Sequence, residues 1–160
     1  MRSAEIRFKY DEAFARLATK RFLLRYARTL LFLLPVAAII GIWFAIEGSF
    51  SLAVIMITLV LAAIASLMRY AGRAVKLSRR LGAPEIDVVA DDGGISFRMN
   101  GNQSRSEWSQ HRVVWRFDDV WLFFPYTVSN AYTGIPAAAM TPEFRDIVID
   151  NINKHGGTLR

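Results

Sequence analysis

The sequence predicts a membrane α-helical hairpin joined to an α+β soluble domain, in which an antiparallel β-sheet is followed by a C-terminal helix. Two long apolar stretches, 29–46 and 50–68, lack ionisable side chains and lie close together. Beyond residue 84 apolar and polar residues alternate, and a capped amphipathic segment follows near the end of the chain. We therefore expect four parts, which are an N-terminal strand and basic juxtamembrane helix (1–28), the transmembrane hairpin (29–68), a second basic juxtamembrane helix (69–83), and a cytoplasmic β-domain with a C-terminal helix (84–160).

The chain begins with the pattern of a β-strand. Ile6, Phe8 and Tyr10 alternate with charged side chains over residues 4–10, the period of a strand with one buried face. A lone amphipathic strand is not stable in water. Because two membrane crossings return the chain to its starting side, we expect this strand to join the sheet of 84–140; the alternative is a frayed terminus.

Both apolar stretches are just long enough to cross a bilayer. At ~1.5 Å rise per residue the helices would be roughly 27–29 Å long, close to the ~30 Å hydrocarbon core. A core helix of a soluble protein normally keeps a polar stripe, and neither stretch has one. We favour two spans over two soluble core helices, with Glu47-Gly48-Ser49 as a tight tip at 47–49 in which Gly48 supplies the turn geometry. A cleaved signal peptide is disfavoured because a long, largely polar segment precedes the first stretch.

The distribution of cations predicts the orientation. Lys and Arg gather before the first stretch and after the second, whereas the tip carries only Glu47. Since cations are retained on the cytoplasmic side during insertion, we expect an integral membrane protein with both termini cytoplasmic, in the bacterial inner membrane. The residues expected to contact the membrane surface are Lys20, Arg21, Arg25, Arg28, Arg69, Arg73, Lys76 and Arg80.

The last four of these cations share one face if the second helix continues past the membrane. That face should lie against anionic head groups, each cation contributing ~1 kcal/mol. Retention of topology alone is the simpler account of the same charges.

Small residues on the first span predict how the two helices pack. Ala37, Gly41 and Ala45 are spaced four apart, and so are Leu52, Met56 and Val60 on the second span. Close approach through small residues supplies the contacts that hold helices together in lipid. A tight tip pairs residues whose numbers sum to about 97, which sets Gly41 beside Met56; contact between copies of the chain is the alternative use of the same residues.

Residues 84–140 are typical of a small antiparallel sheet. Alternation over 85–90 and 95–100 flanks the turn sequence Asp91-Asp92-Gly93-Gly94, which predicts a β-hairpin. The apolar run 120–124 indicates a strand buried on both faces. A short strand is expected around Tyr132, between Asn130 and Gly134.

Another strand is expected over 108–117, with Val113, Trp115 and Phe117 inward. Trp108 is out of phase with these three, so we predict a bulge or bend between Ser109 and Arg112, with Trp108 under the final helix.

The final helix is marked by Thr141-Pro142-Glu143, which provides a cap, a proline at the first position and an acidic side chain near the dipole. Phe144, Ile147, Val148 and Ile152 form its buried face, and Gly156-Gly157 ends it. The residues expected in the domain core are Trp108, Trp115, Phe117, Phe144, Ile147 and Val148.

With two close-set spans, Glu107-Trp108-Ser109 followed by Val113, and Ile135-Pro136 before a capped helix, the chain resembles the YcxB-like proteins. The resemblance covers most of the chain. It implies a pleckstrin-homology-like C-terminal domain and no assigned biochemical activity. The sequence departs from the family pattern at His111, where an aliphatic residue is usual, and at Ala137, where Lys is common.

The residues offer little support for catalysis. There is no Cys, and His111 and His155 lie in different elements without metal-ligand spacing. The pairs Asp91-Asp92 and Asp118-Asp119 could hold a hard cation, but both stand where turns favour Asp. We expect no enzyme, no cofactor and no metal site.

Transport and nucleic-acid binding are also disfavoured. The spans contain no ionisable residue that could mark an ion path, and residues 84–160 have more acidic than basic side chains, unlike a surface that tracks phosphates. Transport by a larger oligomer stays open.

Two functions remain. The first is a membrane-anchored binding module for a protein, peptide or lipid head group. The second is an immunity or inhibitor protein that blocks one toxin or enzyme near the membrane. The expected partners are the bilayer and one protein or peptide, with no nucleic acid, and oligomers are possible.

Overall fold

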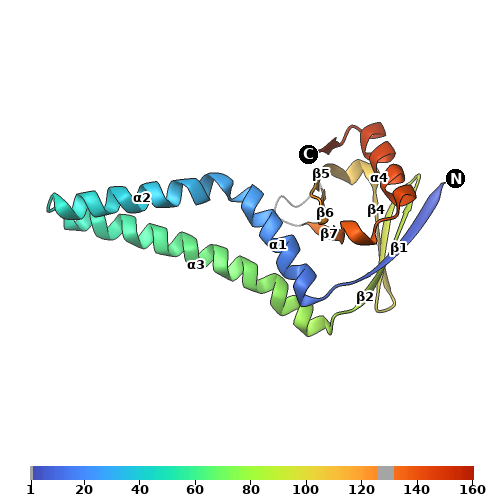
Figure 1. The fold of residues 1–160 in the computed structure, drawn as a ribbon, viewed down its shortest axis with the longest axis horizontal. Helices are drawn as coiled ribbons and strands as arrows, with labels where there is room; N and C mark the ends of the chain where they lie inside the picture. Colours follow the sequence, from blue (N-terminus) through green and yellow to red (C-terminus); the bar gives the residue numbers. More distant parts are fainter. Residues whose placement is uncertain (1, 126–131) are drawn as a thin grey trace. The chain divides into compact units, whose positions relative to one another are not determined.

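The computed structural model describes residues 2–125 and 132–160, with the backbone only at 29–31. Within this part the chain has an α+β fold of four α-helices and two four-stranded sheets (Figure 1). It divides into a β-rich unit, residues 1–18 with 78–160, and a helical unit, residues 19–77. The elements in order are β1 (Ser3–Lys9), α1 (Glu12–Tyr26), α2 (Arg28–Ile46), α3 (Phe50–Leu81), β2 (Glu85–Asp91), β3 (Gly94–Met99), β4 (Asn102–Glu107), η1 (Trp108–Gln110), β5 (His111–Arg116), β6 (Val120–Pro125), β7 (Thr133–Pro136), η2 (Ala137–Ala139), α4 (Pro142–Lys154) and β8 (Thr158–Leu159).

The first sheet is an antiparallel meander in the order β1-β2-β3-β4. β1 pairs with β2, with Ile6 opposite Val88, so the expected pairing of the N-terminal strand is confirmed. β2 and β3 form the expected hairpin, in which Val88 lies opposite Phe97. Ile6, Val88 and Ile95 are buried on its inner face.

The second sheet has the order β7-β6-β5-β8, in which β8 runs parallel to β5 and the other pairs are antiparallel. β6 is buried on both faces through Val120, Leu122 and Phe123, as its continuous apolar run predicts. The short strand expected around Tyr132 is β7, which starts one residue later; Asn130 lies outside the described residues. We expected one sheet, whereas the strands form two because the chain bends at η1 between β4 and β5.

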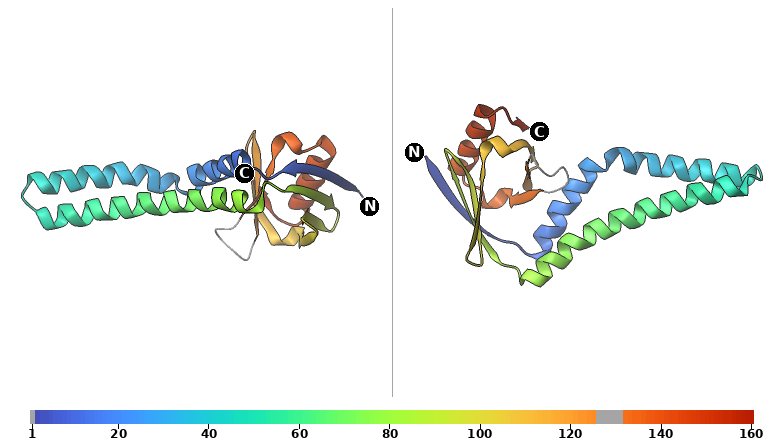
Figure 2. Two further views of the ribbon diagram at one scale, coloured as in Figure 1. Left: turned by 90° about the horizontal axis from the view of Figure 1, so that it is seen from below. Right: turned by 180° about the vertical axis from the view of Figure 1, so that it is seen from behind.

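α4 packs against β1 and β2 of the first sheet, against β8 of the second sheet and against η1 (Figure 2). Its cap is the predicted one, since the Thr141 side chain accepts a hydrogen bond from Phe144 N at 3.2 Å and Pro142 follows at the first position. Phe144, Ile147, Val148 and Ile152 are buried. The helix ends at Lys154, before Gly156 with φ of 73°.

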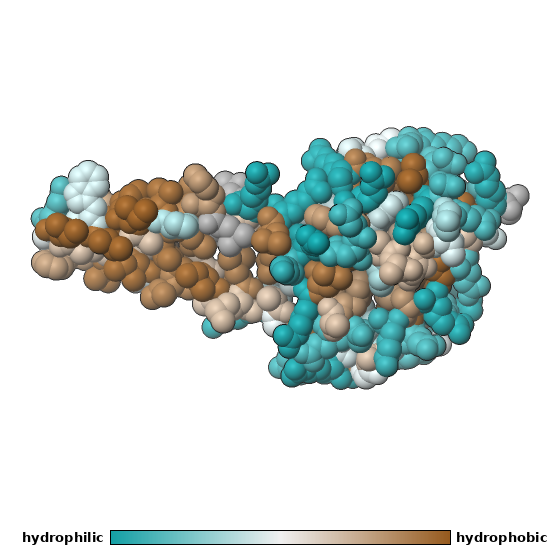
Figure 3. Space-filling model, in the orientation of Figure 1, coloured by the Kyte–Doolittle hydropathy of each residue, from teal (hydrophilic) through white to brown (hydrophobic). Residues whose placement is uncertain are grey.

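The helical unit contains α2 and most of α3, which run side by side in opposite directions in the views of Figures 1 and 2. At the tip Ser49 N donates to Phe44 O and Gly48 N to Ala45 O, and Gly48 has a φ of 80°. These bonds close the end of α2 in a Schellman motif, so Gly48 fills the turn position expected of it. The surface of this hairpin is coloured mainly brown in Figure 3.

Among the described residues, α3 is long and apolar enough to cross a membrane, and Phe32–Ile46 forms a shorter apolar helix. The length and apolar composition of α3 therefore support the second expected span, and the first expected span stays a prediction.

Candidate functional site

The candidate site is a groove of the β-rich unit beside the turn between β5 and β6. Its volume is about 460 Å³. The turn contributes charged and aromatic side chains, and η2 and the first turns of α4 form the other wall. The lining residues are Arg116, Phe117, Asp118, Trp121, Ala137, Pro142, Arg145, Asp146 and Ile149.

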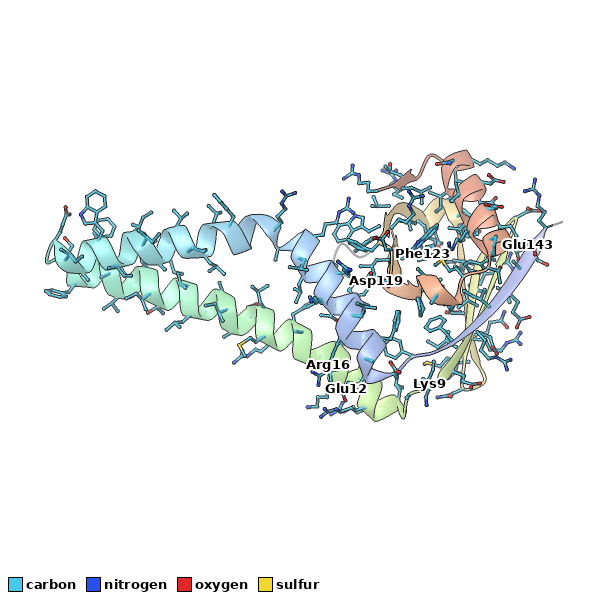
Figure 4. All side chains as sticks on the ribbon, viewed as in Figure 1. Lys9, Glu12, Arg16, Asp119, Phe123 and Glu143 are labelled. Carbon is cyan, nitrogen blue, oxygen red and sulfur yellow. The ribbon has the colours of Figure 1, made fainter. Side chains whose placement is uncertain are left out.

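A series of hydrogen bonds fixes the two walls. Phe117 N donates to Val120 O at 3.0 Å, which closes the turn, and Ala137 N donates to Asp119 O at 3.0 Å, which ties η2 to it. Arg145 Nη2 then donates to Ala137 O at 2.7 Å, which joins α4 to η2. Figure 4 labels Asp119 in the turn and Glu143 near the start of α4.

The groove carries charges of both signs over an apolar floor. Arg116, Asp118 and Asp146 make no side-chain hydrogen bond or ion pair with any described residue. Arg145 Nε is buried and has no acceptor among them. Trp121 is almost fully buried beneath these groups. Two arginines and two aspartates balance in charge, so the groove suits a ligand with donors, acceptors and apolar groups better than a polyanion.

The sequence did not single out this groove, because its walls come from segments that are separated along the chain. The only local signal is the turn sequence Asp118-Asp119 after Arg116, which resembles any polar turn. Of the two charged residues of α4 that line the groove, Asp146 is exposed and Arg145 is half-buried, and neither belongs to the apolar face of the helix.

Trp108 lies in η1 and is 1% exposed, and its Nε1 donates to Asp91 O at 2.7 Å. The predicted bend is present, since residues 108–110 form a 3₁₀ turn and the β5–β6 register shifts between His111 and Val113. Phe144, Ile147 and Val148 are also in the core.

Trp115 and Phe117 are only half-buried, contrary to their expected place in the core. The shift after His111 reverses the phase of β5, so that Val114 points inward and is fully buried. Phe117 lies in the turn and lines the groove. The Trp115 ring packs on Phe124, with centroids 4.4 Å apart.

His111 begins β5 and is 4% exposed. Its Nε2 lies 2.7 Å from Ser106 Oγ, whereas Nδ1 is buried without a partner among the described residues. Burial lowers the pKa of His111, because the charged form loses its hydration. Among the described residues no carboxylate bonds to Nδ1, the position at which a catalytic triad holds the carboxylate that orients its histidine. His155 is the C-terminal cap residue of α4, where its ring Nδ1 lies 2.9 Å from Asn151 O.

Asp91 serves the turn between β2 and β3. Its Oδ1 accepts hydrogen bonds from Gly93 N at 2.8 Å, Gly94 N at 3.0 Å and Arg105 Nη2 at 2.8 Å. Burial raises the pKa of this carboxyl, but the hydrogen bonds and the charge of Arg105 outweigh it, so the pKa is lowered. In the described ranges no group of three acidic or histidine side chains could hold a metal ion.

In the hairpin, the small residues of α2 face α3. A Cβ placed on Gly41 would lie 3.3 Å from Met56 Cβ, so these two residues are neighbours as in the register whose numbers sum to about 97. Ala37, Ala45, Met56 and Val60 are half-buried. Leu52 is 46% exposed, and Ala53 is buried in its place. An α-helix has 3.6 residues per turn, so residues spaced by exactly four gradually leave the face that contacts the partner helix. The residue that faces α2 one turn nearer the tip is therefore Ala53, three positions before Met56, and not Leu52.

The expected surface cations lie on long helices of the helical unit and its continuation. Arg69, Arg73, Lys76 and Arg80 are exposed on α3, which continues without a break to Leu81. Lys20 and Arg28 are exposed, whereas Arg21 and Arg25 are half-buried.

Comparison of the chain with family models, with curated proteins and with solved structures gives no match.

Proposed function

We propose that this chain is a membrane-anchored, non-enzymatic protein that holds a pleckstrin-homology-like binding domain at the cytoplasmic face of the bacterial inner membrane. In this proposal α2 and α3 both cross the bilayer, and the groove beside the β5–β6 turn binds a peptide or protein.

The exposure of the hairpin carries the proposal. Only 6% of the most apolar 18-residue stretch of α3 is buried within the chain, whereas a helix in the core of a soluble protein would be mostly buried. On α2, Phe32 is 73% exposed and Ile46 is 80% exposed. Continuous apolar surface of this extent needs a cover, and a bilayer supplies it over both helices. At ~1.5 Å per residue α2 would be roughly 28 Å long, which suffices for a crossing.

The chain order supports a common compartment for both ends. β1 precedes the hairpin and β2 follows it, yet the two strands pair over their full length. Two crossings bring them to the same side, and the cations that flank the hairpin favour the cytoplasm.

The form of the β-rich unit is compatible with a pleckstrin-homology-like domain. It has antiparallel meanders followed by the C-terminal helix α4, which is what the resemblance to YcxB-like proteins implies. The parallel strand β8 is an addition to that plan.

A peptide or protein suits the groove better than a lipid head group. Asp118 and Asp146 would repel a phosphate, whereas they can accept hydrogen bonds from a peptide and attract its cations. Arg116 can bind a carboxylate as a two-donor fork. Phe117 offers an aromatic surface beside them, as protein interfaces favour.

The alternative is an immunity or inhibitor protein that uses the same groove to block a toxin or enzyme. It predicts one tight partner, whereas a general binding module would accept several.

Anchoring is tested first. Full-length protein should stay in the membrane pellet after alkaline carbonate extraction. A single cysteine at Ser49 should react with an impermeant maleimide in intact cells, and one at Gln103 should react only after the membrane is opened. Release by carbonate would overturn the anchoring, and the opposite labelling pattern would overturn the orientation.

Binding is tested by a photo-crosslinking amino acid placed at Asp118 or Asp146, which are exposed in the groove. Gln103 on β4 is a matched exposed control. We expect discrete protein adducts from the two groove positions and none from the control. A single adduct that survives purification would favour the inhibitor, several would favour the general module, and equal labelling at all positions would refute the groove.

A further inference from the structure

A second hollow lies on α3, at the point where the apolar stretch ends. Its volume is about 400 Å³, and it is lined by Ala62, Ala65, Ser66, Arg69, Tyr70 and Arg73. Because α3 is continuous, these residues follow one another along one face of the helix. The small side chains lie toward the apolar stretch of α3, and the two arginines lie toward the basic C-terminal end of the helix.

The hollow contains two arginines for which the described part of the chain offers no acidic partner. Neither Arg69 nor Arg73 makes an ion pair with any described residue. By contrast, Arg79 on the same helix pairs with Glu12 at 2.7 Å, Arg105 pairs with Asp91 at 2.8 Å and Arg2 pairs with Asp150 at 3.2 Å. The positive charge of the hollow is therefore available to an external anion.

One wall of the hollow is held in place by aromatic stacking. The Tyr70 ring stacks on Phe22 of α1, with centroids 5.3 Å apart, and Phe22 stacks on Tyr26 at 5.0 Å. Phe22 is 1% exposed. Tyr70 is thus fixed beside the arginines, whereas a side chain on a lone helix would be free to rotate.

Along the hollow, small apolar side chains are followed by arginines, the order that an acyl chain and its phosphate head group would need. Arg69 directly follows Met68, the last residue of the apolar stretch, so it lies at the depth of the phosphates if α3 spans the bilayer. Ala62 is seven residues earlier, or ~10 Å deeper at 1.5 Å per residue. A phosphate can take two parallel hydrogen bonds from each guanidinium, and an acyl chain can fill the space that Ala62 and Ala65 leave.

We propose that this hollow binds one anionic phospholipid of the cytoplasmic leaflet, with its phosphate between Arg69 and Arg73 and an acyl chain along Ala62 and Ala65. Basic pockets between membrane helices on the cytoplasmic side bind lipid head groups in other proteins. The inference rests on the proposed membrane anchoring, and it makes the lipid a ligand at one defined site.

The test uses the full-length protein in a mild detergent, with lipid retention measured by native mass spectrometry during titration with phosphatidylglycerol or phosphatidylcholine. We expect one phosphatidylglycerol per chain, retained in preference to phosphatidylcholine. The double variant Arg69→Gln with Arg73→Gln should weaken retention at least about tenfold, since each cation near an anionic head group contributes to binding.

Two matched variants separate a site from diffuse attraction. Lys76→Gln with Arg80→Gln removes the same charge from the same face outside the hollow and should weaken retention clearly less than the arginine pair does. Ala65→Leu keeps the charge but fills the hollow at an exposed position, and it should weaken retention as strongly as the arginine pair. Equal losses from both charge pairs, with no effect of Ala65→Leu, would overturn the proposal.

Glycerol phosphate is added as a competitor to distinguish a lipid from a soluble anion. If glycerol phosphate displaced phosphatidylglycerol at equal concentration, the acyl chains of the lipid would contribute nothing to binding, and the lipid assignment would be overturned. Failure of the anchoring itself is recognised separately, because carbonate would then release the protein. A protein that resists carbonate but retains no phosphatidylglycerol would refute the lipid site alone.

Discussion

Glu12 at the start of α1 accepts hydrogen bonds from two arginines. Arg79 Nε lies 2.7 Å from Glu12 Oε2, and Arg16, one turn along α1, bonds to Oε1 (Figure 4). Hydrogen bonds from Arg79 and then Arg16 lower the pKa of the Glu12 carboxyl to about 2 from an ordinary value of 4.5. Because the folded pKa is the lower one, the stabilisation is fully present above pH 4.5 and is lost as the pH falls toward 2.

The first prediction concerns this titration. The Glu12 carboxyl carbon, followed by NMR in the full-length protein in micelles, should titrate with a midpoint near 2. Arg79→Gln should raise the midpoint more than Arg16→Gln, because the bond to Arg79 has the larger effect. Lys76→Gln, on the same helix but without an ion pair to Glu12, is the control and should leave it unchanged. A wild-type midpoint near 4.5 would show that the carboxylate is not held between the arginines.

Single residues also mark where sequence reasoning succeeded and where it failed. Trp108 and Val113 are five positions apart, so a regular strand would place them on opposite faces, and this predicted the bend at η1. The same reasoning placed Val113, Trp115 and Phe117 inward, but the register shift after His111 leaves all three half-buried. A break in the alternation of apolar residues predicts a bulge. Which residues point inward after the bulge depends on the pairing with the neighbouring strand, which the sequence does not show.

At the scale of elements, the well-predicted ones carry local signals. The turn sequence before β3, the cap of α4 and the glycine of the tip each satisfy backbone groups through nearby residues. β4, with the sequence NQSRSE, was missed because it is an edge strand exposed on nearly all its residues and shows no alternation. β8 was missed because two residues beside β5 give no pattern. The division into two sheets and the groove depend on contacts between distant segments.

The second prediction tests the close approach of β3 and β4. A Cβ on Gly94 would lie 2.3 Å from the backbone oxygen of Ser106, which cannot move without breaking the ladder. Gly94→Ala should therefore destabilise the protein by about 1–3 kcal/mol, seen as a drop of several degrees in Tm. The measurement is thermal unfolding of the full-length protein in detergent, followed by circular dichroism.

Gly93→Ala is the matched control in the same turn. Its Cβ would meet the movable end of the Arg105 side chain at 2.9 Å and Asp91 Oδ1 at 3.3 Å. The Arg105 side chain can rotate away, so the drop in Tm should be clearly smaller than for Gly94→Ala. Equal losses from both variants would mean that the strands do not approach as closely as the backbone positions indicate.

At the scale of the whole molecule, the first strand of a sheet is separated in the sequence from its partner by α1 and by the hairpin of α2 and α3. β1 can pair with β2 only after α1, α2 and α3 have been made. Without β1, strand β2 would become an edge with unpaired backbone groups, which favours aggregation. The sequence indicated this arrangement because a lone amphipathic strand before two apolar stretches has no other partner.

The last prediction tests the register of the hairpin, on which the return of the chain depends. The sequence has no Cys, so paired cysteines can be introduced without background. A Cβ at position 41 lies 3.3 Å from that of Met56, near the ~3.5–4.5 Å of a disulfide. Gly41→Cys with Met56→Cys should therefore oxidise within one chain, giving a monomer whose faster gel mobility is reversed by reductant. Gly41→Cys with Val60→Cys displaces the second thiol by one turn, ~6 Å along α3, and should not close. A disulfide that forms only between chains would contradict the register, and it would assign Ala37, Gly41 and Ala45 to an interface between copies of the protein.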